Sequence, residues 1–181
     1  MIDFAACRLY SNDFIPGLDG GILTLSVLMV CTGNICRSPM AEGLLWHLLP
    51  KNLKPVVSVR SAGTHGLHGN RAEPFAVRAA AAHGADISQH RARILDAGMI
   101  RSADLVLAME RYHIDRINDL LFFRCKYALL LGSLAAERQS PEIEDPYGSP
   151  FDAYETCARE IVTCMPGLID DIRQKVDRKA S

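Results

Sequence analysis

The sequence predicts an α/β fold: a single domain with an open, mainly four-stranded parallel sheet and helices on both faces. Two observations lead to this prediction. Four short apolar runs of strand length are separated by segments in which apolar residues recur every three or four positions. Strands that alternate with helices in this way form parallel sheets, because each helix carries the chain back to the start of the next strand. With 181 residues, 49% of them hydrophobic, the chain is long enough for one ordinary buried core.

The first strand and the helix after it form the clearest unit. The run LSVLMVC (25–31) has the length and apolar density of a buried strand. Apolar residues with helical spacing follow it at Met40, Leu44, Leu45 and Leu48. Ser38 and Pro39 are favourable at the N-cap and at the first position of a helix, so we expect the helix to begin there.

Three more strands and three more helices follow in alternation. The expected strands are VVSVRS (56–61), ADLVLAM (103–109) and KYALLL (126–131). The expected helices cover 72–84, 110–121 and 151–172. Gly84 suits the end of the first of these helices, and Pro166-Gly167 should kink or break the last one.

Residues 1–24 fit neither pattern, and we expect an N-terminal extension outside the core. The folded domain should then cover 25–176, with a short C-terminal tail at 177–181. The 20 basic and 21 acidic residues leave a net charge of −1, so we expect no nucleic-acid or membrane partner. The chain shows no apolar run of membrane-spanning length and no signal peptide, and its six cysteines lack CxxC spacing. We therefore expect reduced thiols in a cytoplasmic protein.

Cys31 ends the first predicted strand, at the edge of an open α/β sheet where ligands bind. Arg37 follows five residues later and offers a planar fork that can hold two oxygen atoms of a phosphate. The backbone N–H groups between them can surround an anion, and the positive end of the next helix points at the same place. Such surroundings favour a thiolate, so Cys31 is predicted to be a nucleophile directed at phosphorus. The residues that supply these N–H groups are Thr32, Gly33, Asn34, Ile35 and Cys36.

Asp145 is the candidate proton donor for this reaction. An oxygen leaving group departs poorly without a proton, and EDPYG (144–148) places a carboxyl group in a loop between the last strand and the last helix. Ordinary structural roles are the alternative, since Cys31 could be a core cysteine and Asp145 could serve a turn. The presence of both residues in one chain favours the catalytic interpretation.

These motifs together resemble the bacterial branch of the low-molecular-weight protein tyrosine phosphatases. The blocks that carry the resemblance occur in the family's order and approximate spacing: VCTGNICRSPMAE, SAGTHG (61–66), HRAR (90–93), ADLVLAM and EDPYG. The resemblance implies that 25–176 is a catalytic domain that hydrolyses phosphotyrosine in proteins through a phosphocysteine intermediate, with no metal and no cofactor. It also implies a phosphotyrosine-containing protein as the partner, such as a tyrosine autokinase in exopolysaccharide control.

The resemblance assigns the catalytic roles by position. Cys31 would attack phosphorus, and Asp145 would protonate the leaving tyrosine and then activate water. The amides of 32–37, together with Arg37, would bind the phosphoryl oxygens, and Ser38 would support the thiolate.

Further residues would shape the site in the same way. Asn34 would hold the unusual backbone of the loop, with Ser61 and His90 as supporting partners. Leu67 and Tyr147 would form walls of the substrate entrance, where an aromatic ring fits.

Two other functions suit the same loop. Thioredoxin-coupled arsenate reductases of this fold also use C-x5-R, but they need two further cysteines after the third strand, and 98–124 contains none. Cys157 and Cys164 lie instead in the last predicted helix, where packed thiols are the simpler explanation. A non-catalytic phosphopeptide-binding module would need neither Cys31 nor Asp145.

Cys36 allows a redox hypothesis. It could trap an oxidised Cys31 as a disulfide before irreversible oxidation, or it could be a small residue that fills the loop. Zinc binding by the two thiols is disfavoured, because their spacing is not a usual zinc hook and no matching second pair occurs.

Overall fold

The computed structural model describes residues 24–180. The strands in this part of the chain are β1 (Leu25–Cys31), β2 (Val57–Gly63), β3 (Leu105–Ala108) and β4 (Ala128–Leu130). The helices are α1 (Arg37–Leu48), α2 (Pro74–Ala82), α3 (Ala97–Ser102), α4 (Arg111–Leu121) and α5 (Phe151–Ala180). Two short 3₁₀ turns are η2 (Lys54–Val56) and η3 (Leu131–Leu134). The expected extension 1–24 lies, apart from Thr24, outside the described residues.

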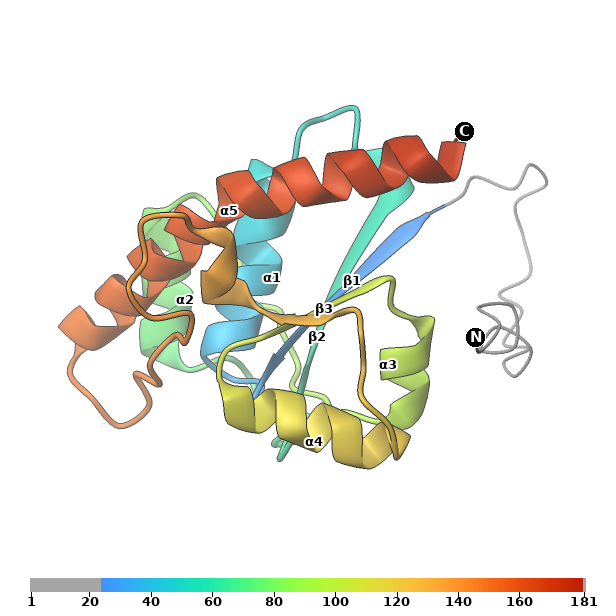
Figure 1. Ribbon diagram of the computed structural model, residues 1–181. Coiled ribbons are helices and arrows are strands. Elements are labelled where there is room, and N and C mark those ends of the chain that lie inside the picture. Colours follow the sequence, from blue (N-terminus) through green and yellow to red (C-terminus); the bar gives the residue numbers. More distant parts are fainter. Residues whose placement is uncertain (1–23, 181) are drawn as a thin grey trace.

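The strands form one parallel sheet in the order β2-β1-β3-β4. Cys31 pairs with Gly63 of β2, and Val30 pairs with Ala108 of β3. The carboxyl ends of these strands therefore meet at one edge of the sheet, the lower edge in Figure 1. The predicted four-stranded parallel sheet, with its loop after the first strand, is confirmed.

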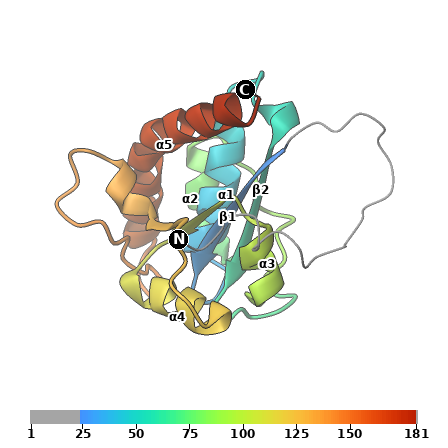
Figure 2. The ribbon, with the colours of Figure 1, turned by 45° about the vertical axis from the view of Figure 1, so that its right-hand side comes forward.

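Helices cover both faces of the sheet (Figure 2). On one face, α1 and α5 pack on alternate β1 residues such as Val27 and Met29, and α2 packs against α1 and α5. On the other face, α3 and α4 belong to a second core with Leu28 and Val30. Burial on both faces explains why β1 is apolar at every position except Ser26 and has no alternating polar face.

Helix α1 begins two residues earlier than the sequence predicts. Cys36 occupies the N-cap and makes no side-chain capping bond, so the predicted N-cap role of Ser38 is wrong. Ser38 lies in the first helical turn, where its hydroxyl group bonds to side chains of the preceding loop. The contacts within this loop thus outweigh the ordinary capping preference of serine.

Helix α5 runs through Pro166, so of the two predicted outcomes, a kink or a break, the break is wrong and the kink remains. The helix instead changes direction along its length (Figure 1), as an internal proline permits. Its buried apolar side chains continue on both sides of the proline, and this packing offsets the lost hydrogen bond. Gly167 lets η3 approach, because a Cβ there would lie 2.2 Å from the carbonyl oxygen of Leu134. Neither α5 nor any other helix among residues 24–180 is both long and apolar enough to cross a membrane.

Candidate active site

The loop between β1 and α1 surrounds the thiol of Cys31 with hydrogen-bond donors. The sulfur accepts a bond from the backbone N–H of Asn34 at 3.3 Å and lies 2.9 Å from Oγ of Ser38. Nδ2 of Asn34 donates to the same Oγ at 2.8 Å, so the hydroxyl proton of Ser38 is left to point at the sulfur. Donors directed at the sulfur are the environment that a nucleophilic thiolate requires.

Asn34 fixes the shape of this loop. Its φ angle is 56°, in the left-handed region that few residues other than glycine adopt, and it is fully buried. Nδ2 also donates to Oγ of Ser61, Oδ1 accepts from the backbone of Arg93, and the carbonyl oxygen accepts from Nε2 of His90. Ser61 and His90 therefore lie against the loop, in the supporting positions expected from the sequence.

Gly63 allows the loop to lie directly on the end of β2. A Cβ at this position would stand 2.4 Å from the carbonyl oxygen of Thr32 and 2.9 Å from the backbone nitrogen of Asn34. Both atoms belong to the backbone, so neither can move without distorting the loop. The close approach therefore requires glycine here.

Arg37 is almost completely buried and is held by two carboxylates. Nη1 donates to Glu110 at 2.5 Å and to the carbonyl oxygen of Ile143 at 3.0 Å. Nη2 donates to the carboxylate of Asp145 and, at 3.4 Å, to Oγ1 of Thr32. Burial opposes the positive charge, but Asp145 and Glu110 more than offset it, so the pKa of Arg37 is raised.

One edge of the Arg37 guanidinium is left for a ligand. Its Nε is buried and finds no acceptor within the described part of the chain. An unsatisfied buried donor costs about 1–3 kcal/mol, which an oxygen atom of a bound anion would relieve. Nη2 shares this edge with Nε, so a second oxygen of the anion can lie beside the first if it replaces Asp145 on Nη2.

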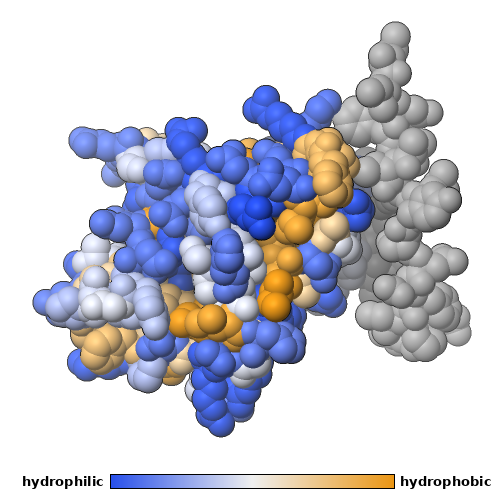
Figure 3. Space-filling view, turned by 90° about the horizontal axis from the view of Figure 1, so that it is seen from below, coloured by the Kyte–Doolittle hydropathy of each residue, from blue (hydrophilic) through white to orange (hydrophobic). Residues whose placement is uncertain are grey.

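The residues predicted for catalysis meet at one cavity of about 280 Å³. Polar groups of the loop form its floor, while Leu67 and Tyr147 stand at its mouth with 45% and 61% exposure. The protein surface on this side, seen from below in Figure 3, is mainly hydrophilic with separate hydrophobic patches. The sequence-predicted residues that line the cavity are Cys31, Thr32, Gly33, Ile35, Cys36, Arg37, Leu67, Asp145 and Tyr147. Asn34, Ser38, Ser61 and His90 lie behind this lining.

Sequence reasoning missed two residues at the start of α4. The carboxylate of Glu110 binds Arg37 and also accepts from the backbone N–H of His113. In return, Nδ1 of His113 accepts from the backbone N–H of Glu110. His113 is fully buried, with Nε2 3.0 Å from Oγ1 of Thr32. Burial above all, and then the charge of Arg37, lowers its pKa to about 4. The signal for Glu110 was its place two residues after the end of β3, the strand beside β1.

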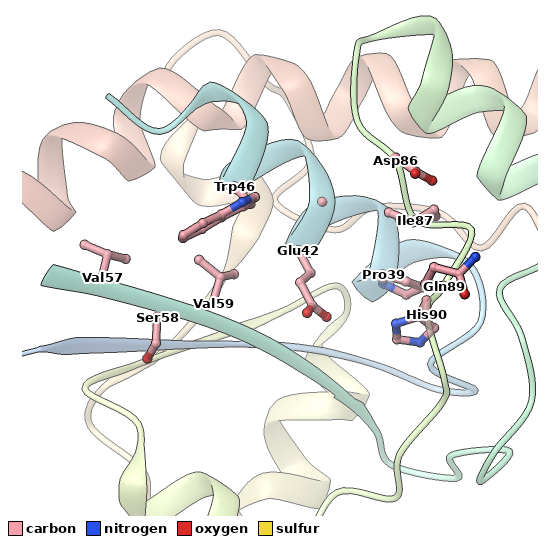
Figure 4. A pocket seen from close by; sticks show the side chains of 11 residues that line it. Pro39, Glu42, Trp46, Val57, Ser58, Val59, Asp86, Ile87, Gln89 and His90 are labelled. Atoms are coloured by element: carbon pink, nitrogen blue, oxygen red, sulfur yellow. The ribbon is translucent and has the colours of Figure 1, made fainter. Parts of the chain in front are cut away.

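A larger hollow of about 490 Å³ lies behind the loop, between α1, β2 and residues 86–90 (Figure 4). Glu42 and His90 line it and connect it to the loop, because Glu42 accepts from Ser61 and His90 donates to Asn34. Sequence reasoning also missed Glu42. None of the catalytic candidates lines this hollow, so the chemistry belongs to the smaller cavity.

The described residues do not favour a metal site. Within 24–180, no three His, Cys, Asp or Glu side chains form a group that could hold a metal ion. Burial, with smaller contributions from Asp145 and Cys31, raises the pKa of Cys36 to about 12. A zinc ligand must be a thiolate, so this thiol is poorly suited to that role.

Comparisons with known proteins identify the family to which this chain is similar. The family model described as low molecular weight phosphotyrosine protein phosphatase matches residues 26–179. The low molecular weight protein-tyrosine-phosphatase Etp of Escherichia coli K12 is 42% identical over 130 residues, which is 72% of this chain and 82% of Etp. The crystal structure of the Erwinia amylovora tyrosine phosphatase AmsI superposes with a TM-score of 0.72 at 33% identity, covering 86% of this chain and 97% of AmsI.

A second solved structure has a different named substrate. The YwlE arginine phosphatase from Geobacillus stearothermophilus superposes with a TM-score of 0.72 at 31% identity, covering 83% of this chain and 94% of YwlE. The shared fold therefore includes phosphatases named for different phosphorylated residues. Because the family model matches most of the chain and the relatives are covered almost throughout, this protein belongs to the low molecular weight phosphotyrosine protein phosphatase family.

Proposed function

We propose that this protein hydrolyses phosphotyrosine in proteins through a phosphocysteine intermediate, without a metal. The observation that carries the proposal is the convergence of Cys31, Arg37 and Asp145 on one cavity with a polar floor and apolar walls. The loop amides, the start of α1 and Arg37 supply the positive charge that a metal would otherwise contribute.

The first step forms the phosphocysteine. Sγ of Cys31 attacks phosphorus, the bond between phosphorus and the tyrosyl oxygen breaks, and Asp145 gives its proton to that oxygen. Arg37 and the amides of 32–37 bind the phosphoryl oxygens while negative charge builds on them. Ser38 stabilises the sulfur through its hydroxyl proton.

The second step restores the enzyme. Asp145, now ionised, accepts a proton from water as the water oxygen bonds to phosphorus and the bond to sulfur breaks. Inorganic phosphate leaves with the oxygen of that water. The same carboxyl group thus serves as acid and then as base, as microscopic reversibility of the two displacements suggests.

The cavity walls support an aromatic substrate over a phosphorylated arginine. Ile35, Leu67 and Tyr147 present apolar surface beside the mouth, which suits the two faces of a tyrosine ring. A guanidinium leaving group would need carboxylate partners of its own, and Asp145, which already serves as the proton donor, is the single carboxylate among the described residues that line the cavity.

The cysteines support a phosphatase over an arsenate reductase. Cys157 and Cys164 are buried in α5, and burial raises the pKa of both thiols. A thiol relay to thioredoxin needs accessible, reactive thiols. A pure binding module would not need a nucleophile and a proton donor at the same cavity.

The physiological part of the proposal is a role beside a bacterial tyrosine kinase. Its substrate would be a phosphotyrosine-containing protein, such as a tyrosine autokinase that controls exopolysaccharide export. The described cysteines are all free thiols, which supports a cytoplasmic location.

Parallel assays test the proposed activity. Wild type should hydrolyse phosphotyrosine peptides faster than phosphoserine or phosphoarginine peptides, and EDTA should leave the rate unchanged. Cys31→Ser should abolish turnover but keep phosphate binding, because the amides and Arg37 remain. Activity that is lost on chelation and restored by a divalent ion would contradict the proposal, and so would a preference for phosphoarginine.

A further inference from the structure

The hydroxyl group of Thr32 has a proton that no described residue accepts, and we infer that this proton binds an oxygen of the bound phosphoryl group. The inference rests on the proposed function, since it takes a phosphate group as the ligand. It adds a side-chain donor to the backbone amides and Arg37. Thr32 lines the same cavity as Cys31.

The argument begins with the tautomer of His113. The backbone N–H of Glu110 donates to Nδ1 of this ring at 3.0 Å, so Nδ1 is an acceptor and carries no proton. A protonated imidazolium is thereby excluded, in agreement with the pKa of about 4 that burial imposes. The single ring proton must then be on Nε2.

This proton determines how Thr32 is used. Nε2 lies 3.0 Å from Oγ1 of Thr32 but 3.7 Å from the Glu110 carboxylate, so Thr32 accepts the bond. Nη2 of Arg37 donates to the same Oγ1 at 3.4 Å. A hydroxyl group has two acceptor positions and one proton, and the two incoming donors occupy both acceptor positions. The Thr32 proton is therefore left to point away from them.

Arg37 indicates which ligand would accept this proton. The same Nη2 belongs to the edge whose Nε lacks an acceptor, which is where phosphoryl oxygens would bind. A hydroxyl group beside that edge, on the wall of the cavity, serves the same ligand. Since His113 does not line the cavity, it is a positioning residue that acts through Thr32.

The direct test measures binding of inorganic phosphate by calorimetry, because this needs no turnover. Thr32→Val keeps the shape of the side chain and removes the hydroxyl group, while Thr32→Ser restores it. A hydrogen bond to a charged group predicts that Thr32→Val weakens phosphate binding roughly 10- to 100-fold and that Thr32→Ser stays within about threefold of wild type.

The outcomes separate this inference from the proposed function. Wild-type phosphate affinity in Thr32→Val would overturn the inference, even if phosphotyrosine turnover were normal. If phosphate binding depends on the hydroxyl group while wild type hydrolyses no phosphotyrosine, the inference stands and the proposed function fails.

A matched pair of variants tests the positioning role of His113. The amide nitrogen of His113→Gln reaches the place of Nε2 and can donate to Thr32, whereas the amide oxygen of His113→Asn takes the place of Nδ1 and can accept only from Glu110. His113→Gln should keep phosphate affinity within about threefold, and His113→Asn should lose it roughly tenfold or more. In a Thr32→Val background, neither change should weaken phosphate binding further. The reverse order of the two variants would show that His113 serves only the start of α4, and would overturn its assignment.

Discussion

Replacement of Asp145 by Asn tests the assignment of the general acid. The amide oxygen of Asn can still accept from the backbone N–H of Tyr147, which holds Asp145 at 3.2 Å, so the loop should keep its position. Arg37 keeps Glu110 and the carbonyl oxygen of Ile143 as partners. The variant therefore removes the transferable proton and one ion pair while leaving the floor of the cavity in place.

The expected loss depends on the leaving group. Tyrosine, with a phenol pKa of about 10, needs a proton as it departs, so kcat for a phosphotyrosine peptide should fall on the order of 10² to 10⁴. An aryl phosphate with a strongly acidic phenol needs little help and should slow much less. Glu144→Gln is the matched control, because it removes the neighbouring exposed carboxylate and should leave both rates nearly unchanged.

The pH profile gives an independent measurement. The general acid must carry its proton in the enzyme–substrate complex, so the kcat profile of wild type should have a basic limb that the Asn variant lacks. Equal slowing of both substrates, with the pH profile unchanged in shape, would show that Asp145 only positions the loop and that another residue donates the proton.

Four further results are expected. Peroxide-inactivated wild type should recover with dithiothreitol while Cys36→Ser recovers much less; equal recovery would exclude the redox role of Cys36. Deletion of residues 1–22 should leave kcat within about twofold, because they contain no candidate site residue, and a severe loss in folded protein would contradict this. Gly63→Ala should lower kcat about 100-fold, because the added Cβ displaces the phosphate-binding loop. Gly98→Ala is the control and should keep its activity. A fully active Gly63→Ala variant would refute the close-packing argument. His113 has a pKa of about 4 in the folded protein and an ordinary value of 6.5, so the unfolded chain takes up the proton first as pH falls. The free energy of unfolding of wild type should therefore fall by about 2 kcal/mol between pH 7 and pH 5, a loss that His113→Asn does not show. Urea-unfolding curves with the same pH dependence in both proteins would contradict this.

The fold could be predicted because burial on both faces of a parallel sheet leaves a simple mark in the sequence. β1 is apolar from Val27 to Cys31 without a break, and α1 and α5 carry helical spacing, so the order of strand and helices already implies the sheet. Two details of the fold that were not predicted, the short helix α3 and the continuity of α5, depend on tertiary contacts. The six residues of α3 are too few to show a helical period, and the unbroken course of α5 depends on packing that its own sequence does not display.

The candidate site divides in the same way between local and distant information. The residues from Cys31 to Ser38 are contiguous, so one stretch of sequence contains the whole anion-binding loop. Asp145 is 108 positions from Arg37 and could be proposed only because the chemistry requires an acid. Glu110 is 73 positions from Arg37, and their contact follows from β3 lying beside β1, which sequence order alone does not state.

The two carboxylates on Arg37 have different consequences for catalysis. Glu110 is held on Nη1, on the far side from the edge with the free Nε, so it can stay when a phosphate binds. Asp145 is held on Nη2, which lies on that edge, so an arriving dianion competes with it for the same donor. Displacement from Nη2 would free the Asp145 carboxyl group from its ion pair while the phosphoryl group is being bound. Arg37 would thus hold Asp145 in the empty site and release it to the leaving oxygen when substrate binds, which joins substrate binding to the placement of the general acid.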